Sequence, residues 1–169
     1  MRYLTVIRHC EAENASPDID RHLSAQGRKQ AEALRQWVLS SEELGAYGPT
    51  TCLVSAAART RETYAIGLAG TPFVRSLAVS ELIYNGVRDV TGRDLVNALA
   101  DIDPVTESLS IVAHNPSVLD LVYELTATWP QQLPVAFEVG SAYVLEIPDD
   151  RPLEYGKYRL VDVFVPLAQ

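Results

Sequence analysis

The sequence has 169 residues, of which 47% are hydrophobic and 21% charged, and its formal net charge at pH 7 is -8. This length predicts a single domain over residues 1–169, and the composition is typical of a globular protein with one apolar core. The excess of acidic residues argues against nucleic acid and anionic membranes as partners, because both need a basic footprint.

The sequence pattern indicates neither a targeting signal nor a disulfide framework or metal site. The N-terminal residues do not show the signal-peptide pattern of a positively charged segment followed by an apolar segment and a cleavage site. No apolar run is long enough to cross a membrane, so we expect a cytoplasmic protein. Cys10 and Cys52 are too few for a disulfide framework and are expected as reduced thiols. The histidines are scattered without the spacing of metal ligands, which predicts a protein without metal or other cofactor.

The first predicted element is a strand over about residues 3–8, where an apolar run ends abruptly in Arg8 and His9. In an open α/β sheet the carboxyl ends of parallel strands face the ligand crevice, so both side chains are expected there. Arginine offers a planar fork of donors to phosphate, and a neutral imidazole is a nucleophile. Alone, the pair fits either phosphoryl transfer through histidine or a structural salt bridge.

Helix-like and strand-like segments alternate along the rest of the chain. The predicted helices lie at about residues 25–39, 57–68, 91–102 and 116–125. The predicted strands after the first lie at about residues 51–54, 73–79, 109–113, 137–147 and 158–165. The last two strands are expected to pair antiparallel at a sheet edge. The fold class expected is therefore α/β, a three-layer α/β/α domain with a mostly parallel central sheet and an antiparallel edge.

Capping signals mark three of the helix starts. Ser24 is suited to the N-cap of the first helix. Thr91 and Asp94 have the spacing of a capping box. Before the last helix, Asn115 suits the N-cap and Pro116 the first helical position.

Three predicted strands end in polar groups that carry chemistry. Arg8 and His9 follow the first strand, Ser55 ends the second with Arg59 four residues on, and His114 follows the fourth at a helix N-terminus. A shared phosphate pocket needs such a set, with two guanidinium groups, two imidazoles and a helix N-terminus converging on one anion. Two nearby arginines would also favour the neutral, nucleophilic form of His9 by charge repulsion.

Four short blocks occur in order along the chain, at residues 8–10 (Arg8-His9-Cys10), 23–31, 55–63 and 114–117. They resemble the Arg-His-Gly, Leu-Ser/Thr-x-x-Gly-x-x-Gln-Ala, Ser-x-x-x-Arg-x-x-x-Thr and strand-His-helix motifs of the histidine phosphatase superfamily, branch 1, the phosphoglycerate-mutase-like group. Within that superfamily, the short length and the Asp-x-x-Arg-x-Leu-Ser sequence at residues 18–24 resemble the SixA-type phosphohistidine phosphatases. The resemblance implies a phosphoglycerate-mutase-like fold.

The resemblance also implies roles for particular residues. His9 would attack phosphorus and be transiently phosphorylated, while Arg8, Arg59 and His114 stabilise the equatorial oxygens. Water would then hydrolyse the phosphohistidine without a metal, since the arginines and the helix terminus supply positive charge. Glu81 falls where relatives place the proton donor for the leaving group.

Two further residues are candidates for substrate binding. Asn115 lies beside His114 at the predicted helix start. Arg21 either reaches the substrate phosphate or braces its loop through Asp18 or Asp20. His22, which stands where SixA-type relatives often have proline, is expected on a surface loop.

Cys10 departs from the motif, because it stands where the family has glycine. Its thiol lies beside two arginines and is expected either to have a lowered pKa or to fill the glycine's space as a small buried residue. Arg61 and Glu62, on the second predicted helix, are expected on a solvated face.

The function that the sequence favours is a metal-independent phosphatase acting on phosphohistidine in a partner protein. About fifty residues separate Arg59 from His114, which leaves little room for a lid, and an open site suits a phosphate displayed on a protein surface. Two alternatives stay open. The chain is a phosphatase of small phosphate esters, such as a sugar phosphate, if Arg21, Tyr84, Asn85 and Arg88 enclose a ligand, or a non-catalytic phosphate-binding module if Cys10 closes the pocket. A mutase is disfavoured because it needs a lid.

Overall fold

The structure is a computed structural model that describes residues 1–40, 47–86, 88–103, 107–127 and 136–166. Its centre is a six-stranded mixed sheet with the strand order β3-β2-β4-β1-β5-β6. The strands are β1 (Arg2–Arg8), β2 (Thr50–Ser55), β3 (Val74–Ser80), β4 (Ser108–Ala113), β5 (Ala142–Ile147) and β6 (Arg159–Phe164). Strands β1 to β4 pair in parallel, and β5 is antiparallel to both of its neighbours, β1 and β6.

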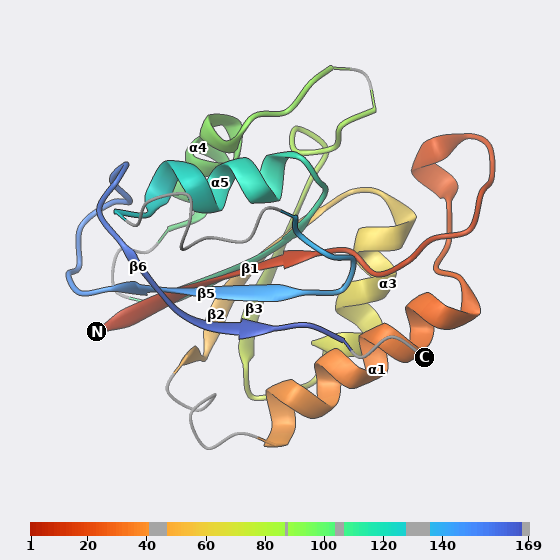
Figure 1. The fold of residues 1–169 in the computed structure, drawn as a ribbon, viewed down its shortest axis with the longest axis horizontal. Coiled ribbons are helices and arrows are strands. Elements are labelled where there is room, and N and C mark those ends of the chain that lie inside the picture. The colour runs from red at the N-terminus through yellow and green to blue at the C-terminus, as the bar shows by residue number, and fades with distance from the viewer. Residues whose placement is uncertain (41–46, 87, 104–106, 128–135, 167–169) are drawn as a thin grey trace.

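Helices cover both faces of this sheet, as Figure 1 shows with α4 and α5 above it and α1 below. The helices are α1 (Ala25–Ser40), α3 (Ala58–Gly67), α4 (Gly92–Ile102) and α5 (Ser117–Leu125), and the 3-10 turn η1 covers Asp18–Asp20. Helix α1 packs against α3, and α4 packs against α5. The architecture confirms the predicted three-layer α/β/α fold with an antiparallel edge. Among the described residues, no helix is long and apolar enough to cross a membrane.

The two layers bury alternate residues of the central strands. Every residue of β4 is buried, as expected for a strand covered on both faces. Leu109 and Ile111 pack into the core under α4 and α5, whereas Val112 packs into the core on the opposite face. In β1, Val6 packs into the core under α4 and α5, and Ile7 packs into the core on the opposite face. This two-residue period fixes which side chains emerge at the carboxyl ends of the strands.

A close backbone approach positions the loop that follows β1. The Ser24 hydroxyl accepts a hydrogen bond from the Gly27 amide at 3.0 Å, which confirms the predicted N-cap of α1. The Ser24 amide in turn donates to the carbonyl of Glu11 at 3.0 Å. A Cβ atom at Gly27 would lie 1.9 Å from that carbonyl oxygen, so only glycine allows α1 to start against this loop. The capping box of Thr91 and Asp94 is likewise confirmed.

Two predicted boundaries are wrong. The last helix has Pro116 at its N-cap, not Asn115, whose side-chain oxygen is buried without a hydrogen-bond partner in the described structure. Strand β5 begins at Ala142 rather than at Phe137. The chain turns before β5 because Gly140 adopts a φ of 76° and its amide donates to the carbonyls of Arg8 and His9.

Candidate active site

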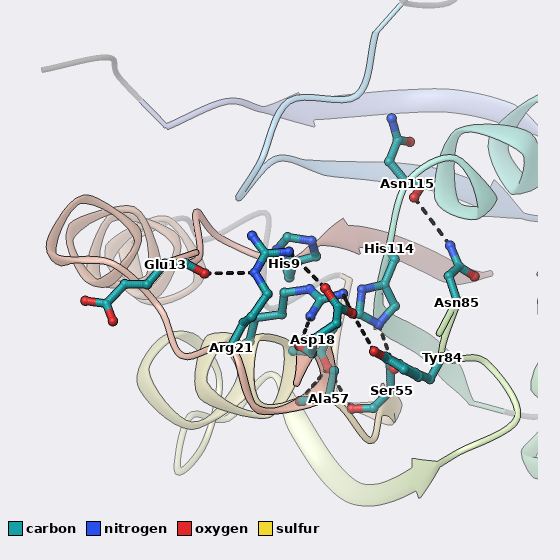
Figure 2. A network of polar contacts seen from close by, with 12 residues as sticks. His9, Glu13, Asp18, Arg21, Ser55, Ala57, Tyr84, Asn85, His114 and Asn115 are labelled. Carbon is teal, nitrogen blue, oxygen red and sulfur yellow. Dashed lines mark hydrogen bonds and ion pairs between the residues drawn. The ribbon is translucent and has the colours of Figure 1, made fainter. Parts of the chain in front are cut away.

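The candidate site lies where β1, β2 and β4 end. Because β4 pairs in parallel with both β1 and β2, the carboxyl ends of these strands are neighbours. The structure therefore brings His9 and His114 together, with ring centroids 5.3 Å apart. Figure 2 shows the two rings beside Ser55, Tyr84 and the polar side chains of the loop after β1.

His9 is held as a neutral imidazole with one defined tautomer. The residue is 9% exposed, and Nδ1 lies 2.7 Å from the carbonyl oxygen of Cys10. A carbonyl oxygen can only accept, so Nδ1 carries the proton and Nε2 keeps its lone pair. Burial, followed by the charges of Arg59 and Arg8, lowers the pKa of His9 to about 4. At neutral pH this side chain therefore presents a nucleophilic nitrogen.

His114 is neutral for the same reasons. It is 2% exposed, and burial together with the neighbouring His9 and Arg59 lowers its pKa to about 3. Its Nε2 lies 2.7 Å from the hydroxyl oxygen of Ser55. Its Nδ1 is buried without a hydrogen-bond partner among the described residues. The ring can therefore offer this nitrogen to a ligand.

Each of the two predicted arginines has N–H groups that make no hydrogen bond in the described structure. Arg59 is 6% exposed and donates from Nη1 to the backbone carbonyl of Asp18 at 2.9 Å and from Nη2 to its carboxylate at 3.1 Å. Arg8 donates from Nη1 to the carbonyl of Phe137 at 2.7 Å. The Nε of each guanidinium is buried and has no partner within the described structure. Buried donors without acceptors are costly, which marks this as a place for an anion.

Asp18 is the centre of a polar network that the sequence did not predict. Its carboxylate accepts from Arg59, from Arg21 at 3.1 Å and from the hydroxyl of Tyr84, which Figure 2 shows on the opposite side of Asp18 from Arg21. The Tyr84 hydrogen bond and the two guanidinium groups lower the pKa of Asp18 to about 2. This carboxylate is therefore ionised at neutral pH, although its side chain is 51% exposed.

Tyr84 packs over the site. Its ring meets that of His114 edge to face at 5.7 Å, and the guanidinium carbon of Arg59 lies 5.9 Å from its centroid. A Cβ atom at Gly86 would lie 1.9 Å from the Tyr84 ring, so a larger residue there would require the ring to shift. Asn85 donates from its side-chain amide to the carbonyl of Asn115 at 3.3 Å. The segment after β3 thus closes one side of the site.

Glu81 lines a cavity of about 640 Å³ together with Asp18 and Tyr84. It is exposed, and its carboxylate makes no hydrogen bond or ion pair within the part of the chain that the structure describes. The structure therefore brings it to the edge of the candidate site without fixing it on His9. Arg88 is exposed.

The structure also shows the contacts of Arg21, His22 and Glu62. Arg21 braces its loop, since it donates to Asp18 and, from Nε, to the carbonyl of Glu13 at 2.8 Å. His22 lies on the surface, as expected, but it pairs with Glu62, whose other carboxylate oxygen accepts from the Leu23 amide at 3.0 Å. The expectation that Glu62 is merely solvated is therefore wrong, because it anchors the approach to α1.

Cys10 is a small buried residue rather than a reactive thiol. It is fully buried, its amide donates to the hydroxyl of Thr63 at 2.9 Å, and burial raises the pKa of its thiol to about 12. This contradicts the alternative of a lowered thiol pKa. Cys52 is also a buried free thiol. Across the described ranges, no group of three or more histidine, cysteine and carboxylate side chains could hold a metal ion.

Comparison with known proteins gives a consistent family and fold. The model of the histidine phosphatase superfamily (branch 1) matches residues 4–102. A proposed SixA phosphohistidine phosphatase from Nakamurella multipartitia superposes with a TM-score of 0.77 and 23% identity over 99% of this chain and 97% of its own. A second from Agrobacterium tumefaciens gives 0.75 and 24% over 97% and 98%, respectively.

A third structure, the protein histidine phosphatase SixA complexed with tungstate, superposes with a TM-score of 0.75 and 19% identity over 97% of both chains. A search of curated proteins finds no significant match. At these identities the superpositions establish the fold, whereas the matched family model covers more than half of the sequence.

Proposed function

The chain is a phosphatase that belongs to branch 1 of the histidine phosphatase superfamily, and from this we propose that it removes phosphate from phosphohistidine in a partner protein. His9 is the proposed nucleophile, and Arg8, Arg59 and His114 bind the phosphoryl oxygens. The observation that carries the proposal is the set of buried, unpartnered nitrogens on these three residues beside a neutral His9. No metal or other cofactor is required, because the two guanidinium groups supply positive charge.

The proposed reaction has two steps. The lone pair on Nε2 of His9 attacks phosphorus in line with the leaving group, and the resulting phosphohistidine is then hydrolysed by water. During both steps Arg8 and Arg59 stabilise the charge on the equatorial oxygens. We assign the Ser55 hydroxyl as the donor to Nε2 of His114, 2.7 Å away, which would leave the proton on Nδ1 and make that nitrogen a donor to phosphate.

The elements between Arg59 and His114 favour a protein substrate. Between Arg59 and His114 the described chain contains the rest of α3, strand β3, helix α4, strand β4 and their connections, and α4 packs on α5. No described element is therefore free to close over a small metabolite, whereas an imidazole on a protein surface needs no enclosure. Imidazole also demands less from a general acid than an alkoxide does.

The test compares kcat/KM for a phosphohistidine-bearing protein with kcat/KM for a panel of phosphomonoesters, using wild type and Glu81→Gln, with His9→Ala as the inactive reference. A preference for phosphohistidine of at least about tenfold that survives Glu81→Gln supports the proposal. A preferred ester whose turnover is lost with Glu81→Gln contradicts it.

The latter outcome would establish the second candidate, a phosphatase of small phosphate esters. The specific observation in its favour is the position of Glu81 on the wall of the 640 Å³ cavity, where a proton donor could reach an ester oxygen. A phosphate-binding module without turnover is the third possibility, and retained binding with no product from any substrate would identify it. The expected cytoplasmic location stays a prediction.

A further inference from the structure

The cavity of about 640 Å³ at the edge of the candidate site is lined by two carboxylates. Asp18 and Glu81 both line it, and none of the described residues that line it is basic. The other walls are apolar or aromatic, with Pro17, Ile19 and the Tyr84 ring. Although Arg59 and Arg21 balance the charge of Asp18, the two carboxylates offer hydrogen-bond acceptors to this cavity, which therefore suits a flat, hydrogen-bond-donating or cationic group.

Asp18 keeps an acceptor site free in this cavity. A carboxylate has about four lone-pair sites. Three are used, since Oδ2 accepts from Arg59 and Tyr84 while Oδ1 accepts from Arg21. The fourth is on Oδ1, and the side chain is half exposed. The carboxylate can therefore accept one more hydrogen bond without releasing any of its partners.

The same contacts place Asp18 beside the guanidinium of Arg59 that would bind the phosphate. Arg59 uses only two of its five N–H groups on Asp18, which leaves Nε and two others for phosphoryl oxygens. A phosphate held by Arg59 beside His9 would thus lie next to the Asp18 carboxylate. The cavity that Asp18 and Tyr84 line is the space that we assign to the group that leaves phosphorus opposite Nε2 of His9.

We propose that Asp18 is a specificity-determining residue, which accepts a hydrogen bond from a protonated leaving group and so selects a phosphoryl group carried on a cationic ring nitrogen. The inference rests on the proposed function and deepens it, because it states what the site recognises in phosphohistidine. One ring nitrogen of the substrate carries the phosphoryl group, and the other carries the proton that hydrogen-bonds to Oδ1 of Asp18.

The chemical step needs no general acid. Attack by Nε2 of His9 forms one P–N bond as the P–N bond of the substrate breaks, and the electron pair of the broken bond returns to the substrate ring. Because that ring already carries a proton on its other nitrogen, it leaves as neutral imidazole. Asp18 stabilises the cationic ring before the step and orients it, whereas Glu81 transfers no proton.

The experiment measures kcat/KM of wild type and Asp18→Asn for two probes, free phosphohistidine and p-nitrophenyl phosphate. The first has a protonated ring as its leaving group, and the second has an anionic phenolate. Loss of a hydrogen bond to a charged group predicts that Asp18→Asn lowers the ratio of the two kcat/KM values on the order of tenfold. Asp20→Asn is the matched control, because Asp20 is an exposed carboxylate of the same turn η1.

The two possible roles of Asp18 are separated by this ratio. If Asp18 only positions Arg59, kcat/KM falls by the same factor for both probes, and an unchanged ratio overturns the inference. A wild-type enzyme that hydrolyses p-nitrophenyl phosphate but not phosphohistidine overturns the proposed function itself. Asparagine has the same shape at this half-exposed position, and Asp18→Ser serves as a second variant should Asp18→Asn fail to fold.

Discussion

At the scale of single residues, the candidate site contains two neutral imidazoles that have different hydrogen-bond partners. The backbone carbonyl of Cys10 fixes the tautomer of His9, whereas the hydroxyl of Ser55 contacts Nε2 of His114. Burial is the first cause of the low pKa of both rings, and the arginine charges add to it. In the proposed mechanism, the nucleophile His9 and the hydrogen-bond donor His114 are thus both neutral before phosphate binds.

The protonation of His9 gives a direct prediction for pH dependence. Its pKa is lowered to about 4, so the neutral nucleophile persists below the usual histidine range and is lost only as pH falls through about 4. An NMR titration of the imidazole resonances between about pH 3 and pH 8 checks this, with His9→Ala assigning the signal. A His9 midpoint above about pH 6 would contradict the burial and charge argument.

Ser55→Ala tests the proposed tautomer of His114. The substitution removes the 2.7 Å contact to Nε2 and leaves the buried ring free to protonate on either nitrogen. We expect kcat to fall about tenfold with little change in KM, because the donor to phosphate matters most in the transition state. Ser76→Ala, on the exposed face of β3, is the control. Wild-type kcat in Ser55→Ala would refute this role.

At the scale of elements, the position of the loop after β1 depends on how closely α1 can approach it. Gly27→Ala would gain about 1 kcal/mol from helix propensity alone. A Cβ atom 1.9 Å from the Glu11 carbonyl outweighs this gain, so we expect a net loss of about 2 kcal/mol in the free energy of unfolding. Urea unfolding measures the change, with Arg28→Ala as an exposed control on the same helix. A stabilised Gly27→Ala protein would show that the loop simply moves away.

Elements and site residues were predictable to different extents. Strands β1, β2 and β4 were predicted within one residue, because fully buried strands are continuous apolar runs. The start of β5 was placed too early at Phe137, since nothing local indicates that its carbonyl accepts from Arg8. The central position of Asp18 was missed for a similar reason. It depends on Tyr84, which is 66 residues away and reaches it only through the fold.

At the scale of the whole molecule, the candidate site and a buried ion pair occupy opposite ends of β1. Arg2 and Asp103 pair at 2.7 Å with side chains 3% and 2% exposed. Arg2 also donates to the carbonyls of Asp149 and Glu107, which ties β1 to the segments that precede β4 and follow β5. A strand of this length spans about 20 Å, so this anchor lies far from His9.

Asp103→Asn should therefore separate stability from activity. The substitution leaves the guanidinium of Arg2 buried without a counter-charge, which predicts a loss of about 3 kcal/mol in the free energy of unfolding. At a temperature where the variant stays folded, kcat/KM should equal that of wild type. Thermal unfolding and steady-state kinetics check both statements, with the exposed Asp101→Asn as control. An equally large loss of kcat/KM would mean that the two ends of β1 are coupled.

The hydrogen bond between His9 and the carbonyl of residue 10 bears on how this protein can vary. Every amino acid has that carbonyl, so no replacement at position 10 can delete the acceptor that keeps the reactive nitrogen bare. The side chain there is free to change as long as it fits the space that Cys10 now fills. The residue next to the proposed nucleophile can therefore be exchanged during evolution while the tautomer of His9 is kept.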